Sequence, residues 1–231
     1  MNGESKESKV DTREVSEKTE ETYEKLSLYI KEQGFAFNID NEPLIDEFAN
    51  LIDEEPIHVA NCVLNTPEHF PLKIKKNGEP YKTQREYLED EPNYEGKKID
   101  YKGVSPEWKQ DDIDWLYLLT YNGHVVKIGM TITSLEDRYG SYSCGTTRAM
   151  KKGSCSTTNF IISECNYMAL RLGINVKIYG IPCPPTLTKK SRFGITKMCR
   201  SSTVRDEETM LTEKFVDTYK HKPVLCVQKG K

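Results

Sequence analysis

The sequence predicts an α+β fold, with a small central three-stranded sheet, mixed or antiparallel, flanked by helices. The prediction rests on two candidate strands joined by a turn and on a third that comes later. Residues 115–120 are aromatic and aliphatic, which is typical of a half-buried strand. Asn122 and Gly123 accept the positive φ of a tight turn, and residues 125–130 follow as the return strand. Residues 176–181 supply the third strand.

The composition divides the chain into three parts. Residues 1–22 are mostly charged and polar and predict a disordered acidic tail. Residues 23–110 are expected to form a mostly helical accessory region, in which residues 57–64 are a candidate strand. Residues 111–231 are expected to form the main domain, with a basic insertion at residues 144–202.

The net charge of −3 hides an asymmetry between the two halves. Residues 1–114 hold 15 Lys and Arg against 28 Asp and Glu, whereas residues 115–231 hold 18 against 8. A basic half of this kind indicates a polyanionic partner, and nucleic acid is the first candidate. The alternative is that the two halves neutralise each other across an internal interface.

The composition of the chain disfavours several classes of protein. No stretch approaches about eighteen uncharged apolar residues, so no membrane span is expected. The polar start is not a secretory signal, which favours an intracellular protein, cytoplasmic or nuclear. Seven cysteines without a C-x-x-C pair favour reduced thiols, and four scattered histidines make a zinc site an unfavoured interpretation.

A last long helix is predicted over residues 201–219, because Leu211 and Phe215 share one face at about 100° per residue. Glu208 lies on that same face. A carboxylate in line with the core is costly unless it is paired or binds a metal. Glu208 is therefore either the partner of an arginine such as Arg138 or a metal ligand, with Glu207 and Glu213 in reserve.

Tyr117, Lys127, Arg138, Tyr142 and Glu208 follow one another in an order that resembles the GIY-YIG nuclease superfamily. That family has a Tyr on a first strand, a Tyr-Ile-Gly about ten residues later, an Arg on the next helix and a metal-binding Glu on a later one. The second motif here is Lys-Ile-Gly, and in this it is similar to that of some restriction enzymes of the family. The family's late Asn has no clear counterpart in this sequence. The resemblance is carried by Tyr117, Lys127, Arg138, Tyr142 and Glu208.

The resemblance implies a DNA endonuclease that uses one Mg²⁺ (or Mn²⁺), with RNA as the alternative substrate. Glu208 would bind the metal, and Arg138 would hold phosphate oxygens through its planar fork. Tyr117 would position or deprotonate the water, and Tyr142 would add a hydroxyl near the phosphate. A free Tyr has a pKa of about 10, so Lys127 is expected either to lower that pKa or to be the base itself.

The register of the hairpin decides whether Lys127 can assist Tyr117. A three-residue loop over residues 121–123 places Tyr117 directly opposite Lys127, whereas a two-residue loop places it opposite Ile128. We expect the three-residue loop and the Tyr117–Lys127 pair.

The basic insertion is expected to contact a nucleic-acid backbone, because phosphates attract cations. Residues 183–194 are predicted to be a loop, which the alternative interpretation leaves simply solvated. A homodimer would supply the two sites needed to cut both strands. Alternative functions are a non-catalytic nucleic-acid-binding module on a decayed nuclease fold and a protein-interaction module. The cations proposed as contacts are Arg148, Lys151, Lys152, Lys189, Lys190 and Arg192.

Overall fold

The computed structural model describes residues 39–65, 77–78, 98–146, 149–150 and 153–226. The predicted tail at residues 1–22 lies outside this part of the chain, as does most of the region before residue 98. The described elements are η2 (Ile39–Asn41), α2 (Ile45–Ile52), β1 (Ile57–Leu64), β2 (Ile99–Gly103), η4 (Pro106–Lys109), β3 (Asp114–Tyr121), β4 (His124–Thr131), α4 (Leu135–Ser143), α6 (Thr157–Arg171), β5 (Val176–Cys183), β6 (Thr186–Arg192), β7 (Ile195–Ser201) and α7 (Val204–Tyr219).

The central sheet has five strands in the order β2-β1-β5-β3-β4, and every neighbouring pair is antiparallel. The α+β class is therefore confirmed, but the three-stranded sheet is wrong. Strands β3, β4 and β5 are the expected ones, and β1 and β2 continue the sheet because the free edge of β5 has backbone groups that need partners. The described part of the N-terminal region thus contributes two strands as well as α2, and it is less helical than expected.

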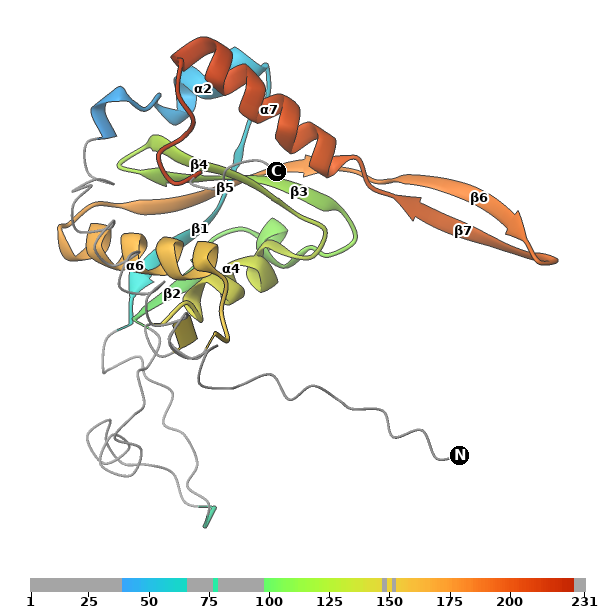
Figure 1. Ribbon diagram of the computed structural model, residues 1–231, viewed down its shortest axis with the longest axis horizontal. Helices are drawn as coiled ribbons and strands as arrows, with labels where there is room; N and C mark the ends of the chain where they lie inside the picture. Colours follow the sequence, from blue (N-terminus) through green and yellow to red (C-terminus); the bar gives the residue numbers. More distant parts are fainter. Residues whose placement is uncertain (1–38, 66–76, 79–97, 147–148, 151–152, 227–231) are drawn as a thin grey trace, which may run out of the picture.

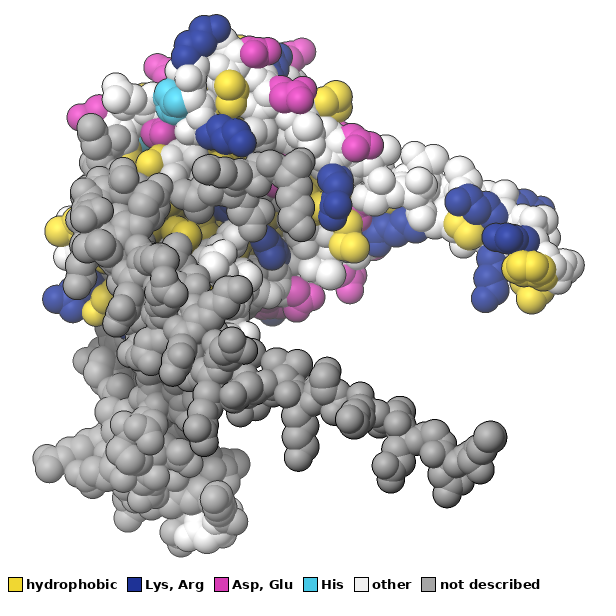
Figure 2. Space-filling view, viewed as in Figure 1, with side chains coloured by type: hydrophobic (Ala, Val, Ile, Leu, Met, Phe, Trp, Pro, Cys, Tyr) yellow, Lys and Arg dark blue, Asp and Glu magenta, His cyan; other side chains and the backbone are white. Residues whose placement is uncertain are grey.

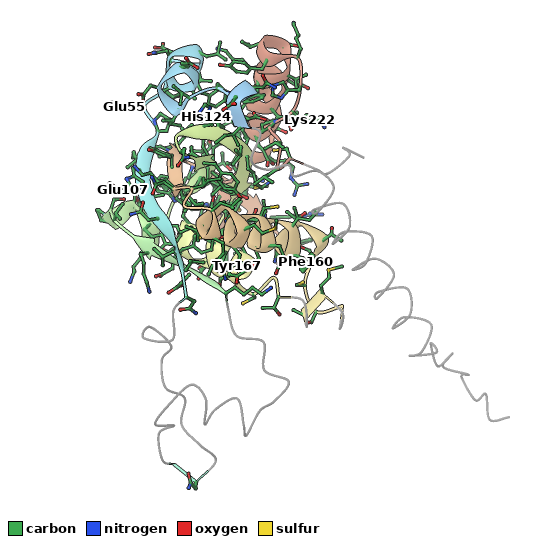
Figure 3. All side chains as sticks on the ribbon, turned by 90° about the vertical axis from the view of Figure 1, so that its left-hand side faces the viewer. Glu55, Glu107, His124, Phe160, Tyr167 and Lys222 are labelled. Carbon is green, nitrogen blue, oxygen red and sulfur yellow. The ribbon has the colours of Figure 1, made fainter. Side chains whose placement is uncertain are left out.

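Helices cover both faces of the sheet. Figure 1 shows α2 and α7 over one face and α4 and α6 over the other, and Figure 3 shows Phe160 and Tyr167 of α6 on the side away from α7. Two apolar clusters follow from this arrangement, one on each face. All eight residues of β3 are buried because the strand lies inside the sheet with both faces covered.

The predicted register of the β3–β4 hairpin is wrong. The loop has two residues, Asn122 and Gly123, both with positive φ (48° and 91°). A β-bulge then adds one residue to β4, so that Tyr117 lies opposite Gly129 and Lys127 lies opposite Leu119. Lys127 remains on the face of the sheet that carries Tyr117, because paired residues share a face and direction alternates along each strand.

The edge of the sheet at β4 is covered by segments from both ends of the described chain. The amide of Val125 donates to Pro43 O at 2.9 Å, and the amide of Leu225 donates to Val126 O at 2.8 Å. Val126 is the extra residue of the bulge, so its carbonyl is satisfied by the C-terminal segment rather than by β3. This covering protects an edge that would otherwise offer a row of unpaired backbone groups.

The basic insertion contains a helix and a ribbon. Residues 160–162 lie inside helix α6 and are buried there. The predicted loop at residues 183–194 instead contains β6, which pairs with β7 in a separate two-stranded ribbon that projects from the body of the molecule (Figure 1). In the part of the chain that the structure describes, no helix is long and apolar enough to cross a bilayer.

Candidate active site

Tyr117 lies in the middle of β3, with 1% of its surface exposed, and its ring crosses directly over Gly129 of β4. A Cβ at position 129 would come within 2.4 Å of the ring carbon Cζ and of the hydroxyl oxygen of Tyr117. Glycine is therefore required at this position by close approach, because a larger residue would displace the Tyr117 ring. The Gly of the Lys-Ile-Gly motif has this packing function.

Arg138 and Tyr142 of α4 converge on the hydroxyl of Tyr117. Arg138 Nε donates to Tyr117 Oη at 3.2 Å, and Arg138 Nη2 donates to Tyr142 Oη at 2.8 Å. The two tyrosine hydroxyls are 2.5 Å apart and share a hydrogen bond. The spacing of four residues places Arg138 and Tyr142 on one face of the helix, with the guanidinium carbon 4.6 Å from the centre of the Tyr142 ring.

Helix α4 is held in place from its first turn to its last. The hydroxyl of Ser134 accepts from the amide of Asp137 at 3.1 Å and caps the helix. Tyr139 packs edge-on against Tyr117 (ring centres 5.2 Å apart) and against Tyr101 (4.9 Å apart). These contacts orient the helix face that carries Arg138.

Tyr139 was not predicted as part of the site, although it lies one residue after Arg138. Its ring is fully buried, and its hydroxyl has no hydrogen-bond partner among the described residues. Burial raises the pKa of Tyr139 and of Tyr142 well above the ordinary value, with the neighbouring Tyr117 adding to the effect in both, so both phenols are neutral at ordinary pH. No local pattern in the sequence indicates that the hydroxyl of Tyr139 is buried.

Glu208 is half-buried on α7, on the same helix face as the buried residues Leu211 and Phe215, as predicted. Within the described residues, no hydrogen bond or ion pair engages its carboxylate, so the expected alternative of an ion pair with Arg138 is not found. Burial raises the pKa of Glu208, and the cations Lys127, Arg138 and Arg205 lower it in part. Glu208 therefore lies within electrostatic reach of both Lys127 and Arg138.

Lys127 is only 8% exposed, which is unusual for a lysine. Its expected role was to face Tyr117 across the ladder, but it is offset from Tyr117 by two positions on β4. The groups that contact the Tyr117 hydroxyl are instead Arg138 and Tyr142. Lys127 lies within electrostatic reach of Glu208, and this approach of β4 to α7 could not be inferred from the hairpin alone.

One cleft of about 930 Å³ lies between the sheet, α4, the start of α6, α7 and the C-terminal segment, and its lining includes Tyr117, Lys127, Arg138 and Glu208. Arg205 and Lys222 also line it and were not predicted. Arg205 had a usable signal, since it lies three residues before Glu208 and so on the same side of the helix. Among the described residues, the charged groups of the cleft are Lys127, Arg138, Arg205, Glu208, Glu213, Asp217 and Lys222, and Tyr117 is its one tyrosine.

The carboxylate of Glu208 fits a magnesium ion better than a metal that needs a closed protein cage. Among the described residues, no three His, Cys, Asp or Glu side chains are grouped so that they could hold a metal. Mg²⁺ commonly keeps several waters and is held by one or two carboxylates together with phosphate oxygens. A carboxylate that is half-buried and free of hydrogen bonds from the described residues suits this kind of binding. The reserve candidates suit it less, because Glu207 accepts a 2.5 Å hydrogen bond from Thr203 and Glu213 is exposed at the cleft wall.

The predicted nucleic-acid contacts fall into two groups. Arg148, Lys151 and Lys152 lie outside the residues that the structure describes. Lys189, Lys190 and Arg192 are exposed on the projecting ribbon.

No protein-family model matches this chain, and no curated protein is similar to it in sequence. The structure is similar to that of restriction endonuclease HPY188I, solved in complex with product DNA. The two are 21% identical over 83% of this chain and 90% of that one, with a TM-score of 0.45. It is also similar to a mutant of EndoII from bacteriophage T4, which is 15% identical over 80% of this chain and 99% of that one, with a TM-score of 0.40.

Proposed function

We propose that the chain is a Mg²⁺-dependent endonuclease that hydrolyses phosphodiester bonds in DNA. The observation that carries this proposal is the convergence of a tyrosine, a guanidinium and a half-buried carboxylate on one cleft, where the buried hydroxyl of Tyr142 bonds to that tyrosine. Phosphodiester hydrolysis needs a group that takes a proton from water, cations that neutralise the phosphate, and a ligand for the metal. The cleft contains a candidate for each.

Tyr117 is the proposed acceptor of the proton from the attacking water. The water oxygen bonds to phosphorus, the bond from phosphorus to the 3′ oxygen breaks, and the proton of the water passes to Tyr117 Oη. Arg138 Nε and the hydroxyl of Tyr142 both lie at the Tyr117 oxygen. They would stabilise the negative charge of the deprotonated Tyr117 that accepts the proton. The remaining N–H groups of the Arg138 fork are directed to phosphate oxygens.

Glu208 is the proposed ligand of Mg²⁺, with Mn²⁺ as the substitute. When bound there, the ion would supply charge neutralisation at the phosphate and at the leaving oxygen. Lys127 also lines the cleft and is proposed to neutralise the same phosphate. Lys127 is also the second candidate for the base.

The Lys127→Arg variant separates the two roles of Lys127, because arginine keeps the positive charge and cannot act as a base. A variant that keeps most of its cleavage supports a cationic role and leaves Tyr117 as the base. A variant as inactive as Tyr117→Phe makes Lys127 the base instead.

The main experiment is cleavage of supercoiled plasmid with Mg²⁺ or Mn²⁺, beside EDTA. Glu208→Gln is expected to lose all cleavage, whereas Glu213→Gln, on the same helix and at the wall of the same cleft, keeps it. Tyr117→Phe is expected to lose about 10²–10⁴-fold, the usual range for a general base. Metal-independent cleavage, or cleavage that survives Glu208→Gln, would contradict the proposal. Linear product from a particle whose mass is that of two chains would support a homodimer with one site per chain.

A non-catalytic DNA-binding module is the second candidate function. The 1% exposure of Tyr117 favours it, because a base must reach the water that it activates. This module would bind DNA with an affinity that falls with salt and would give no product from plasmid, branched DNA or RNA with either metal.

A further inference from the structure

The β6–β7 ribbon is exposed on nearly all of its surface. Of the fourteen residues in its two strands, Thr188 and Cys199 are half-buried and the others are exposed. An isolated two-stranded hairpin is at best marginally stable in water, because it has no face to bury. The ribbon therefore adds little to the stability of the fold, and its sequence is better explained by a partner that it contacts.

The charge of the ribbon has one sign. It carries five cations, Lys189, Lys190, Arg192, Lys197 and Arg200, and no acidic residue. The sequence contains no Asp or Glu between Glu164 and Asp206. Figure 2 shows Lys and Arg side chains gathered toward the free end of the ribbon, next to hydrophobic ones.

Three of these cations share one face. Lys190 lies directly opposite Lys197 in the ladder, and Arg192, two residues along β6, points the same way. Like charges that are directly opposite destabilise an antiparallel pair. An anion laid along this face would remove that repulsion, whereas a neutral partner would not. We call Lys190, Arg192 and Lys197 the basic face.

The turn at the end of the ribbon holds an aromatic residue in a conformation that aromatic residues rarely adopt. Phe193 has a φ of 55°, in the left-handed region, and 86% of its surface is exposed. The guanidinium carbon of Arg192 lies 4.8 Å from the centre of its ring. Asn or Gly would adopt this positive φ at a lower cost in free energy. The position therefore keeps a flat apolar ring beside a cation although the ring makes the turn less stable.

The root of the ribbon is attached to the strand that carries the site. Arg200 of β7 donates to the carboxylate of Asp114, which is fully buried at the start of β3. Asp114 lies three residues before Tyr117 on β3. This contact ties the direction of the ribbon to the strand from which Tyr117 projects.

We propose that the ribbon is an arm that lies against duplex DNA and opens the stack of bases. The basic face follows the phosphate backbone, and the ring of Phe193 inserts at a base step as an apolar wedge, which kinks the duplex. The step that yields most easily is a pyrimidine–purine step, so the arm favours duplexes with such a step beside the cleavage site. The inference rests on the proposed function and adds to it a deformable duplex as the preferred substrate.

The basic face is tested by the affinity of the full chain for a short DNA duplex in EDTA, measured over a range of salt concentrations by fluorescence anisotropy. Each phosphate contact adds about one to the slope of log affinity against log salt. We expect Lys190→Ala and Lys197→Ala each to lower that slope by about one, and Lys214→Ala, a cation on α7, to leave it unchanged. Unchanged slopes in both ribbon variants, or an equal loss in Lys189→Ala from the opposite face, would overturn the assignment.

The wedge is tested with a duplex that carries 2-aminopurine at a central TA step, again in EDTA. The fluorescence of this base rises when it is unstacked, and we expect a rise with the full chain. The rise should disappear in Phe193→Ala and persist in Met198→Ala, which removes another exposed apolar side chain from the same ribbon. No rise with the full chain, or a full rise in Phe193→Ala, would overturn the wedge.

A second copy of the chain is the rival partner for the apolar tip. Light scattering on the same variants separates the two, because loss of dimer in Phe193→Ala without DNA would assign the tip to self-association and overturn the proposal. The inference and the proposed function fail separately. A chain that unstacks the duplex but never cleaves it keeps the arm and loses the nuclease, and a chain that cleaves but never unstacks does the opposite.

Discussion

Two hairpins in this chain close through the same kind of turn and differ in nearly everything else. The β3–β4 turn is Asn122-Gly123 and the β6–β7 turn is Phe193-Gly194, and all four residues have positive φ. The first hairpin is nearly all buried and the second nearly all exposed. A turn sequence that suits its backbone thus accompanies the hairpin that the core needs, and an unsuitable one accompanies the hairpin that projects from the fold.

The cations of the two hairpins also have different surroundings. Lys127 of the first hairpin lies within electrostatic reach of Glu208, so the chain itself provides an opposite charge. Lys190 and Lys197 of the second face one another, and no acidic residue occurs in the ribbon. The buried cation of the first hairpin therefore has an opposite charge nearby in the chain. The facing lysines of the second have none in the ribbon, and an external anion would relieve their repulsion.

The largest effect is expected where the first hairpin is packed most tightly. In Gly129→Ala the new Cβ would overlap the ring of Tyr117, so the hydroxyl must move away from Arg138 and Tyr142. A shift of about 1 Å in such a group can cost about 10²-fold in rate, and we expect a loss of that size in plasmid cleavage. Gly140→Ala is the matched control, because the space around that helical glycine is open. Equal activity of the two variants would show that Tyr117 need not stay where it is.

The second effect separates two neighbouring tyrosines behind the first hairpin. Tyr142→Phe removes the hydroxyl that bonds to Tyr117, and we expect about a tenfold loss of cleavage with little change in thermal unfolding. Tyr139→Phe removes a buried hydroxyl that has no partner among the described residues, so it should leave cleavage intact and stabilise the fold by up to about 1 kcal/mol. If Tyr139→Phe costs more activity than Tyr142→Phe, the proposed roles of the two rings are reversed.

The sequence predicted the parts of the site that depend on local spacing. The four-residue spacing of Arg138 and Tyr142 and the helical position of Glu208 were readable, as was the strand at residues 57–64, because each follows from the period of one element. The register of the first hairpin was not readable. Its bulge at Val126 is accompanied by a hydrogen bond from Leu225, about a hundred residues away, and no local signal announces such a partner.

The ribbon was missed for the opposite reason. Residues 186–192 show no alternation of apolar and polar side chains, because neither face of β6 has a core to pack against. The strand exists through its backbone ladder with β7. Hydrophobic patterning detects strands that build a core, and it does not detect strands that serve a surface.

The third effect concerns the charge that completes the first hairpin. Burial raises the pKa of Glu208, so its carboxylate becomes protonated at a higher pH than an ordinary glutamate, and the proposed Mg²⁺ would be released there. Lys127 lowers that pKa in part, so Lys127→Gln should raise it further and move the acidic limb of the cleavage profile to higher pH. Lys214→Gln, on α7, should leave the limb in place. The pH profile of kcat/KM and a titration of Glu208 by NMR measure the shift, and a limb that stays or moves to lower pH would contradict the coupling.

The smallest effect on stability is expected at the tip of the ribbon, and it distinguishes the two hairpins most directly. Phe193→Asn gives the second turn the Asn-Gly sequence of the first. Because Asn accepts a left-handed φ more readily, the ribbon should become more stable, by less than about 1 kcal/mol. Hydrogen exchange of the ribbon amides should become slower, since the ladder opens less often. The same variant should lose the unstacking of 2-aminopurine, because the aromatic ring is gone.

A variant with a more stable turn and no unstacking of 2-aminopurine would show that Phe193 is retained at this position for what it contacts. Faster exchange, or unstacking that persists, would mean that Phe193 stabilises the ribbon in its own right.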